Sequence, residues 1–541
     1  MEHLSDETKV KVGPDGPATD DRVQPVAVID IGSTAIRLRV AEIRGDSSVH
    51  SLESLQHAVH LGKDTFTLGH IQQSTSEECV KILRSFRRIM AEYGITRADQ
   101  IRAVATSAVR EAENRDAFLD RMYMATQINV EAIEGAEENR LTYIAVHDLF
   151  EDDAALKHSD VAIIEVGGGG TDMIFVRDGR VTFAGAYRLG SLRMRETLET
   201  YRAPADRIRA ILDQHIKRTI DQLHWNVPVQ SVPHLVAVSG DARFAASLIS
   251  PQWEKNHVCR IDLATFCKLV DRLVQIPVDE LVRKHRIPYQ EAETIGPSLL
   301  AYEHLARAFH VKDILVSRAS LRDGLLKEMA VRGAWTFEFA EQAVHAAMAL
   351  AEKFSVDEAH ALHVADLSVR LFRELQAEHG MDERFALLLR IAALLHEVGQ
   401  FISDRSHHKH SMYIILNSDL FGLTRKDIAL IALVARYHRR ATPRPYHIEY
   451  TTMDRDSRLV VSKLAAILRV ADALDRKHSQ QIRDVRFGRE KGAFVITVND
   501  IADLTLEQLA LKEKAILFEQ VFGTKVTLRS ALSADEVVSR G

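Results

Sequence analysis

Two segments of the chain place an acidic residue before a run of small and polar residues. Asp30 begins the first segment and Glu165 begins the second. Glycines let backbone N–H groups approach an anion closely and hydroxyl groups add donors, so both segments predict phosphate binding. The predicted phosphate-binding residues are Gly32, Ser33, Thr34, Gly167, Gly168, Gly169, Gly170 and Thr171. Because proteins hold Mg²⁺ with one or two carboxylates plus substrate phosphates, Asp30 and Glu165 are the predicted Mg²⁺ ligands.

The elements that must position these residues are β-strands. Apolar runs over 26–31 and 36–43 flank the first segment, and runs over 161–166 and 173–176 flank the second. A lone glycine-rich turn is more often a tight β-hairpin. Two copies with matching acids instead predict two similar lobes that face each other across a phosphate cleft.

The motifs together resemble the exopolyphosphatase/guanosine pentaphosphate phosphatase family over nearly all of the chain. The segments that carry the resemblance are Asp30–Ala35, Ala105–Asn114, Glu134–Arg140, Glu165–Asp172, Ser239–Gly240, Leu321–Leu326, Leu395–Gly399, His410–Ser411, Leu416–Leu420 and Arg436–Arg439. The resemblance implies an α/β fold of two actin-like (ribonuclease H-like) lobes around a phosphate cleft. An all-α HD-like domain and a small α+β C-terminal domain are expected to follow.

The length of 541 residues requires several domains. The polar, Gly- and Pro-containing start predicts a disordered tail, helical periodicity dominates from Trp335, and strand-like runs return near the end. The expected parts are a tail over 1–24, lobe I over 25–148, lobe II over 149–330, the helical HD-like domain over 331–478 and the C-terminal domain over 479–541.

The resemblance also implies hydrolysis of a terminal phosphoanhydride. The reaction would release orthophosphate from the end of inorganic polyphosphate. It would also convert guanosine pentaphosphate to the tetraphosphate. Glu138 matches the family's catalytic glutamate, which acts as a general base or positions the attacking water. Arg110 matches the family arginine, whose planar fork of donors suits phosphate oxygens. The resemblance places Asp172 in the same catalytic group.

Two other functions stay open at this point. Thr34, Glu165 and Asp172 differ from the residues usual in the family, so a regulatory protein that binds polyphosphate or alarmones without turnover is one alternative. An actin-like sugar kinase or ATPase would share both loops. The motifs around Arg110 and Glu138 disfavour the kinase or ATPase, because they are phosphatase-family motifs.

The helical half contains His360, His396, Glu397 and Asp472. Imidazole and carboxylate groups together suit a transition metal such as Mn, Fe or Zn. Their order resembles an HD phosphohydrolase metal site, with Glu397 in place of the usual Asp, so a second divalent metal site is one interpretation. The favoured interpretation is a vestigial scaffold whose histidines make structural hydrogen bonds.

A basic run over 425–444 includes Arg439 and Arg440. One interpretation is a solvated helix face. The favoured interpretation is a track that guides polyphosphate toward the cleft, which makes Arg439 and Arg440 predicted substrate-binding residues.

Composition limits the other functions. The 70 Lys+Arg and 76 Asp+Glu give a net charge of −6, which argues against a nucleic-acid partner. Three scattered cysteines indicate no disulfide framework and fit the cytoplasm. No apolar run approaches the ~18 residues that a membrane span needs, so no integral membrane segment is expected. Related long-form proteins imply a homodimer.

Overall fold

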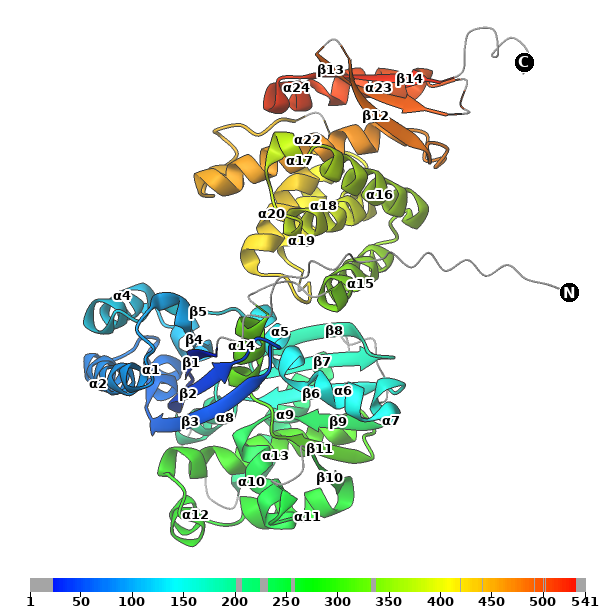
Figure 1. Ribbon diagram of the computed structural model, residues 1–541. Coiled ribbons are helices and arrows are strands. Elements are labelled where there is room, and N and C mark those ends of the chain that lie inside the picture. Colours follow the sequence, from blue (N-terminus) through cyan, green and yellow to red (C-terminus); the bar gives the residue numbers. More distant parts are fainter. Residues whose placement is uncertain are drawn as a thin grey trace, which may run out of the picture.

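The computed structural model describes residues 23–531, except 201–206, 224–231, 254–257, 332–336, 419, 440, 491, 500 and 502. Residues 1–22 of the predicted tail lie outside the described residues. The chain forms a two-lobed α/β part, followed by helices, with a small sheet at the far end (Figure 1). No helix in the described ranges has both the length and the apolar character to cross a membrane.

The first sheet has the strand order β3-β2-β1-β4-β5. Its strands are β1 (Gln24–Ile31), β2 (Ala35–Ile43), β3 (Val49–Ala58), β4 (Ile101–Ala105) and β5 (Val130–Ala132). β1 pairs antiparallel with β2 and parallel with β4. A central strand is covered on both faces, which explains why Val26 to Ile31 is an almost continuous apolar run.

The second sheet repeats this order, with one added strand, as β10-β11-β9-β6-β7-β8. Its strands are β6 (Val161–Val166), β7 (Thr171–Arg177), β8 (Arg180–Tyr187), β9 (His234–Ala237), β10 (Val258–Asp262) and β11 (Asp313–Ser317). β6 pairs antiparallel with β7 and parallel with β9, as β1 does with β2 and β4. The repeat of strand, acid, small residues and strand in the sequence is therefore a repeat of topology.

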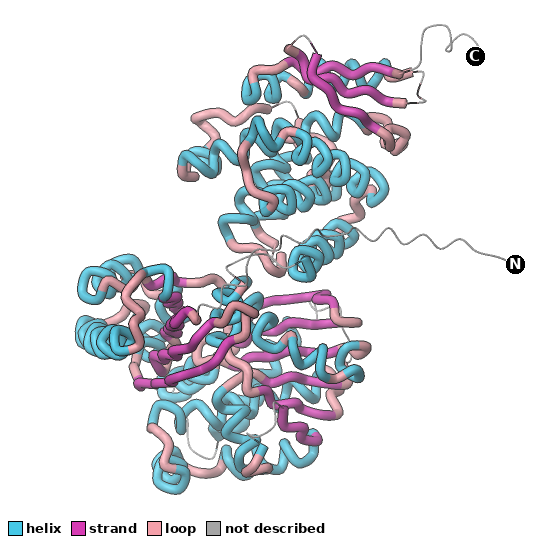
Figure 2. Tube along the Cα trace, in the orientation of Figure 1, coloured by secondary structure: helices cyan, strands magenta, loops and turns pink. Residues whose placement is uncertain are grey.

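Helices flank both sheets (Figure 2). Those before β6 are α1 (Leu61–Leu68), α2 (Gln73–Glu92), α3 (Ser107–Arg110), α4 (Arg115–Thr126), α5 (Gly135–Val146), α6 (Asp148–Asp152) and α7 (Ala154–Lys157). Those after β8 are α8 (Ser191–Thr200), α9 (Ile208–Leu223), α10 (Gly240–Ile249), α11 (Leu263–Val274), α12 (Val278–His285), α13 (Tyr289–Ala308) and α14 (Leu321–Ala330). α14 packs its Leu325 and Leu326 with Val26 and Val28 of the first sheet, although the sequence assigns this segment to lobe II.

The remaining helices are α15 (Phe337–Lys353), α16 (Glu358–Glu374), α17 (Gln376–His379), α18 (Arg384–Leu395), α19 (His407–Leu416), α20 (Arg425–Arg436), α21 (Ile448–Thr451) and α22 (Arg455–Leu474). A sheet of β12 (Val485–Glu490), β13 (Ala493–Val498) and β14 (Lys525–Ser530) carries α23 (Thr505–Lys514) and α24 (Ile516–Phe522).

One hydrophobic core joins these helices to the last sheet. It includes Leu464 and Leu468 of α22 together with Phe494 and Ile496 of β13. The parts predicted as separate domains, 331–478 and 479–541, therefore pack as one unit, because the sheet is too small to bury its apolar face alone. This unit contacts the second lobe through Gln342, whose Nε2 donates to the Gly179 carbonyl over 3.0 Å.

Candidate active site in the cleft between the lobes

The two predicted phosphate loops have the same turn geometry. The amide of Gly32 donates to the carbonyl of Ala35 over 3.0 Å, and the amide of Gly167 donates to the carbonyl of Gly170 over 2.9 Å. Each turn connects the first two strands of its sheet, so the acid that precedes it lies at the end of a central strand.

The loops meet across the cleft at two glycines, where a side chain would crowd the facing residues. A Cβ atom on Gly168 would lie 3.0 Å from the Ser33 Cβ, and one on Gly169 would lie 2.3 Å from the Ser107 Oγ. Within the described residues, no protein acceptor takes the amide N–H of Ser33, Thr34, Gly168 or Gly169. Unpaired amides at a loop of this kind can receive phosphate oxygens.

The loops line a cavity of about 510 Å³. All of the residues predicted for the cleft border it except Thr171, whose hydroxyl is buried against the Leu189 carbonyl. Those that border it are Asp30, Gly32, Ser33, Thr34, Arg110, Glu138, Glu165, Gly167, Gly168, Gly169, Gly170 and Asp172. Asp30 and Asp172 lie at the two ends of a 143-residue interval. They border one cavity because the two lobes have the same topology and face each other across the cleft.

The acids of the cavity are buried close to one another. Burial raises the pKa of Glu165 to about 7, and the nearby charge of Glu138 adds to the rise. Burial and Glu138 raise the pKa of Asp172 well above its usual range. A divalent cation among these carboxylates would offset the repulsion by which they raise each other's pKa, so the cluster fits such a cation. Asp30 and Glu165 would hold Mg²⁺ with substrate phosphates completing its oxygen shell.

Glu138 lies in the first turn of α5 and forms an ion pair with Arg110. The Arg110 Nη1 also donates to the Ile133 carbonyl over 2.6 Å, which fixes the guanidinium at the cavity wall. Burial raises the pKa of Glu138, and Arg110 opposes that rise. A carboxylate that is buried, oriented and more basic than usual is suited to accept a proton from water.

Sequence reasoning missed several polar residues of the cavity, among them Ser107, Arg37, Arg243 and Arg322. Burial lowers the pKa of the Arg322 guanidinium to about 10, and it lowers the pKa of Arg243. One buried and one partly buried cation beside the acids supply positive charge that a polyanion needs. A signal was present, since Arg322 is part of the Leu321–Leu326 motif and Arg243 follows Ser239–Gly240.

Arg439 does not border this cavity, and Arg440 lies outside the described residues. The first part of the basic run forms α20. The two ends of this 12-residue helix lie about 18 Å apart, at ~1.5 Å per residue. The Arg425 Nε, at the start of α20, lies 3.9 Å from the Oε1 of Glu134, the N-cap residue of α5. Arg439 follows the other end of the helix and borders a different cavity in the helical unit.

Two related α/β lobes that each contribute an acid and a glycine turn to one cleft define an actin-like fold. Residues 39–332 match the Ppx/GppA phosphatase family, and residues 344–520 match the Ppx/GppA phosphatase domain III. The chain belongs to the Ppx/GppA phosphatase family. The resemblance stated from the motifs is thereby confirmed.

Individual relatives are distant. The guanosine-5'-triphosphate,3'-diphosphate pyrophosphatases of Pseudoalteromonas atlantica and Photobacterium profundum are each 22% identical and cover 84% of this chain, with 87% and 88% of their own lengths. An exopolyphosphatase from Cytophaga hutchinsonii is 22% identical, with a TM-score of 0.52 over 57% of this chain and 98% of its own. The last similarity supports the fold of the two-lobed part.

We expect Thr142→Val to lower the affinity for Mg²⁺ and to leave substrate binding unchanged. The Thr142 hydroxyl donates to the Glu165 Oε2 over 3.0 Å and so orients a predicted metal ligand. Loss of such a supporting hydrogen bond typically costs about 10- to 100-fold in metal affinity. The Mg²⁺ concentration for half-maximal orthophosphate release should rise accordingly. Thr452→Val, at an exposed hydroxyl, is the control, and equal Mg²⁺ curves for both variants would contradict the assignment.

The pKa of Glu165 predicts a pH-dependent stability in chelated protein. Its folded-state pKa of about 7 lies above the ordinary 4.5, so proton uptake stabilises the folded state at low pH and this stabilisation is lost as pH rises through 7. In EDTA, the melting temperature should fall more between pH 6 and pH 8 in the natural protein than in Glu165→Gln. Parallel changes in both proteins would show that Glu165 does not titrate in this range.

Proposed function

We propose that the protein is an exophosphatase that hydrolyses the terminal phosphoanhydride bond of inorganic polyphosphate and releases orthophosphate. Guanosine pentaphosphate, which would become the tetraphosphate, is the second proposed substrate. The observation that carries the proposal is the shared cavity, where unpaired loop amides and arginines lie beside Glu138.

The residues suit phosphoryl transfer to water. The amides of the two loops and the guanidinium groups of Arg322 and Arg243 would bind the terminal phosphate oxygens. Glu138 would take a proton from the attacking water while the bond between the terminal phosphorus and the bridging oxygen breaks, and Arg110 keeps Glu138 in place. Mg²⁺ held by Asp30 and Glu165 would neutralise charge on the phosphates.

The size and polarity of the cavity suit a phosphate chain. A volume of about 510 Å³ accommodates a short stretch of phosphates, and its polar lining offers recognition of phosphate oxygens. Polyphosphate and guanosine pentaphosphate both present a terminal phosphoanhydride. The curated names of the two bacterial relatives favour keeping guanosine pentaphosphate beside polyphosphate.

The test is orthophosphate release from long-chain polyphosphate and from guanosine pentaphosphate, each with Mg²⁺ and with EDTA. We expect Mg²⁺-dependent release from both, and the two kcat/KM values rank the substrates. Tight binding of polyphosphate with no release from either substrate would overturn the proposal and favour the regulatory binding protein. Turnover of ATP without release from polyphosphate would favour the kinase or ATPase.

Homodimer formation, a cytoplasmic location and an HD-like character of the helical unit stay predictions. Light scattering of the purified chain and fractionation of cells that express it test the first two of these predictions.

A further inference from the structure

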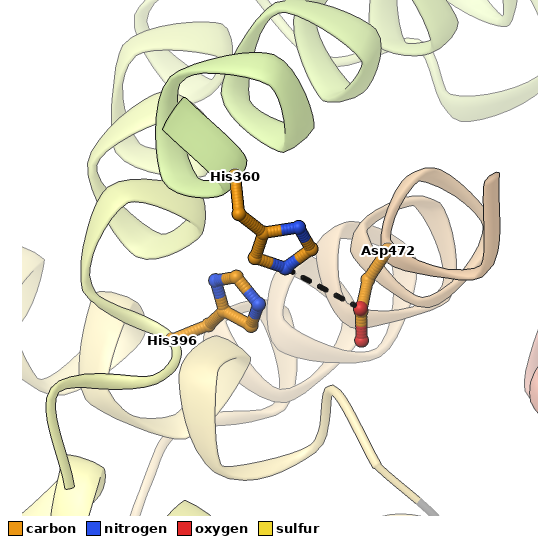
Figure 3. A group of neighbouring side chains, drawn as sticks. All are labelled: His360, His396 and Asp472. Atoms are coloured by element: carbon orange, nitrogen blue, oxygen red, sulfur yellow. Dashed lines mark ion pairs between the residues drawn. The ribbon is translucent and has the colours of Figure 1, made fainter. Parts of the chain in front are cut away.

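The helical unit contains a second group of convergent polar side chains, far from the cleft in sequence. His360 of α16, His396 after α18 and Asp472 of α22 each present one atom within 4.8 Å of the other two (Figure 3). All three residues are buried. Two helices and the end of a third therefore bring these three side chains together.

Within the described residues, each of the two histidines has one ring nitrogen without a hydrogen-bond partner. The Nε2 atoms of His360 and His396 are buried and accept or donate no hydrogen bond. A buried polar atom without a hydrogen-bond partner costs free energy. Two such nitrogens beside a carboxylate therefore indicate a missing ligand. The scaffold interpretation, in which the histidines only make structural hydrogen bonds, leaves these two atoms unexplained.

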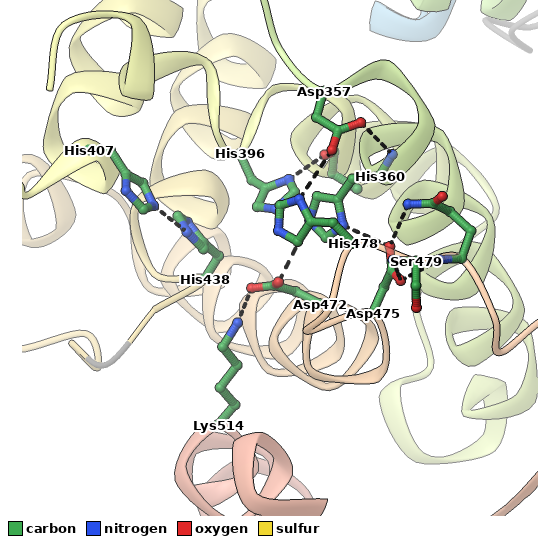
Figure 4. Close-up of polar contacts among 12 residues, drawn as sticks. Asp357, His360, His396, His407, His438, Asp472, Asp475, His478, Ser479 and Lys514 are labelled. Atoms are coloured by element: carbon green, nitrogen blue, oxygen red, sulfur yellow. Dashed lines mark hydrogen bonds and ion pairs between the residues drawn. The ribbon is translucent and has the colours of Figure 1, made fainter. Parts of the chain in front are cut away.

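The other ring nitrogens fix the tautomers. The Nδ1 of His360 donates to the Asp475 Oδ2 over 2.8 Å, and the Nδ1 of His396 donates to the Ala393 carbonyl over 2.6 Å (Figure 4). Because these oxygens only accept, each Nδ1 carries a proton, and the neutral form of each ring has its lone pair on Nε2. A carboxylate or carbonyl behind an imidazole is the usual support of a metal-bound histidine.

The spacing also suits an ion. The Nε2 of His360 lies 3.9 Å from the Oδ1 of Asp472, while the Oδ2 of Asp472 pairs with Lys514. Atoms that share an ion at about 2.0 to 2.2 Å stand roughly 3 to 3.6 Å apart, so a small inward shift closes the site. Glu397 belongs to a second arrangement around His360, with His478 in place of His396 and Asp472, so it is not part of the fully buried group.

A cavity of about 300 Å³ reaches this group at Asp472, although His360 and His396 are not among its lining residues. Asp472 borders it, as do the cationic side chains of Arg439, Arg476 and Lys514. Lys514 pairs with Asp472, whereas no carboxylate within the described ranges pairs with Arg439 or Arg476. Two unpaired guanidinium groups beside a metal position would bind a phosphate group, since arginine forms paired hydrogen bonds with phosphate oxygens.

We propose that His360, His396 and Asp472 bind one divalent transition-metal ion, and that Arg439 and Arg476 hold a phosphate-bearing ligand on its open side. Two imidazoles and a carboxylate favour ions such as Co²⁺, Mn²⁺ or Zn²⁺ over Mg²⁺, which prefers oxygen. The site is separate from the cleft and does not depend on the proposed phosphatase function.

The first measurement titrates Co²⁺ into the chelator-stripped full-length protein with excess Mg²⁺, which occupies an all-oxygen site in the cleft. We expect one Co²⁺ per chain, with visible absorption bands of nitrogen-coordinated Co²⁺. His396→Gln should lower the Co²⁺ affinity at least about 100-fold, and Asp475→Asn should lower it about 10- to 100-fold. The absence of these bands in the natural protein, or unchanged affinity in His396→Gln, would overturn the metal site.

His379→Gln is the matched control. His379 is buried in the same unit, but both of its ring nitrogens have partners, the Phe372 carbonyl and the Met381 amide. Its loss should leave the Co²⁺ bands intact. Circular dichroism and orthophosphate release from polyphosphate show whether each variant remains folded.

The second measurement adds inorganic phosphate to the Co²⁺ form and follows the same absorption bands, which report only on this site. We expect phosphate to shift the bands in the natural protein, and the double variant Arg439→Ala/Arg476→Ala to require at least tenfold more phosphate while it keeps its Co²⁺ affinity. Bands that phosphate does not change would overturn the phosphate ligand. An equal response in the double variant would show that the arginines do not hold it.

Discussion

Glu138→Gln will release orthophosphate from polyphosphate on the order of 10²- to 10⁴-fold more slowly than the natural protein, because positioned general bases contribute about that much. The amide keeps the shape of the side chain and its contact with Arg110, but it cannot accept a proton at neutral pH. Binding of polyphosphate should change little, since the loop amides and arginines remain. Single-turnover release and equilibrium binding separate these two effects.

Glu137→Gln is a demanding control for this variant, because Glu137 is the adjacent acid of the same helix. Its carboxylate accepts two hydrogen bonds from Arg140, at 2.6 and 2.7 Å, and does not border the cavity. Arg140 also pairs with Glu328 of α14, so it keeps one partner. The control should lower the melting temperature and keep kcat within about threefold, since its partners lie outside the cavity. If Glu137→Gln rather than Glu138→Gln stopped release, the assignment of the base would be wrong.

Gly190→Ala will reduce kcat/KM on the order of 100-fold or more, although Gly190 is not among the residues of the cavity. A Cβ at this position would lie 2.3 Å from the Gly168 carbonyl oxygen and 2.6 Å from the Gly170 nitrogen. Both atoms belong to the backbone of the second phosphate loop, so the loop must move. A displacement of about 1 Å in a positioning group costs about that factor.

Gly488→Ala is the matched control for the glycine variant. A Cβ on Gly488 would meet no heavy atom within 4 Å, so its kinetic constants should equal those of the natural protein. Melting temperatures show whether Gly190→Ala has lost its fold rather than its loop geometry. A folded Gly190→Ala with normal kcat/KM would mean that the second loop does not hold the substrate.

The contacts between the lobes identify residues that neither loop could indicate. Glu111, at the end of α3, accepts hydrogen bonds from Arg188 over 2.6 Å and from Arg193 over 3.0 Å. Arg193 also lies over the ring of Phe66, 4.2 Å from its centroid. These interactions tie the two lobes together beside the cleft and hold the loops in register.

Features with short-range causes could be predicted from the sequence. An acid, a turn and a second strand lie within about a dozen residues, so bond geometry alone keeps Asp30 beside Gly32 and Glu165 beside Gly167. The repeat of this unit predicted two similar lobes, and the strand orders agree with it. The family motifs predicted Glu138 and Arg110, which the structure brings into an ion pair.

Features with long-range causes needed the tertiary structure. Arg243 and Arg322 border the cleft only because α10 and α14 begin at its edge. Arg439 borders a cavity of the helical unit and not the cleft, and a basic run gives no information on which end of α20 faces the cleft. The last sheet shares the core of the helices, which no change of composition near residue 478 could reveal.

In the helical unit, too, the sequence determined some features and the tertiary structure decided others. The sequence by itself determined which histidines and acids are present and that they lie on helices. Only the packing of α16, α18 and α22 decided that His360, His396 and Asp472 converge, whereas Glu397 joins His360 in a different group. The reason is physical: spacing along one helix fixes which side chains share its face, but the contact between helices depends on how all their apolar faces are buried together.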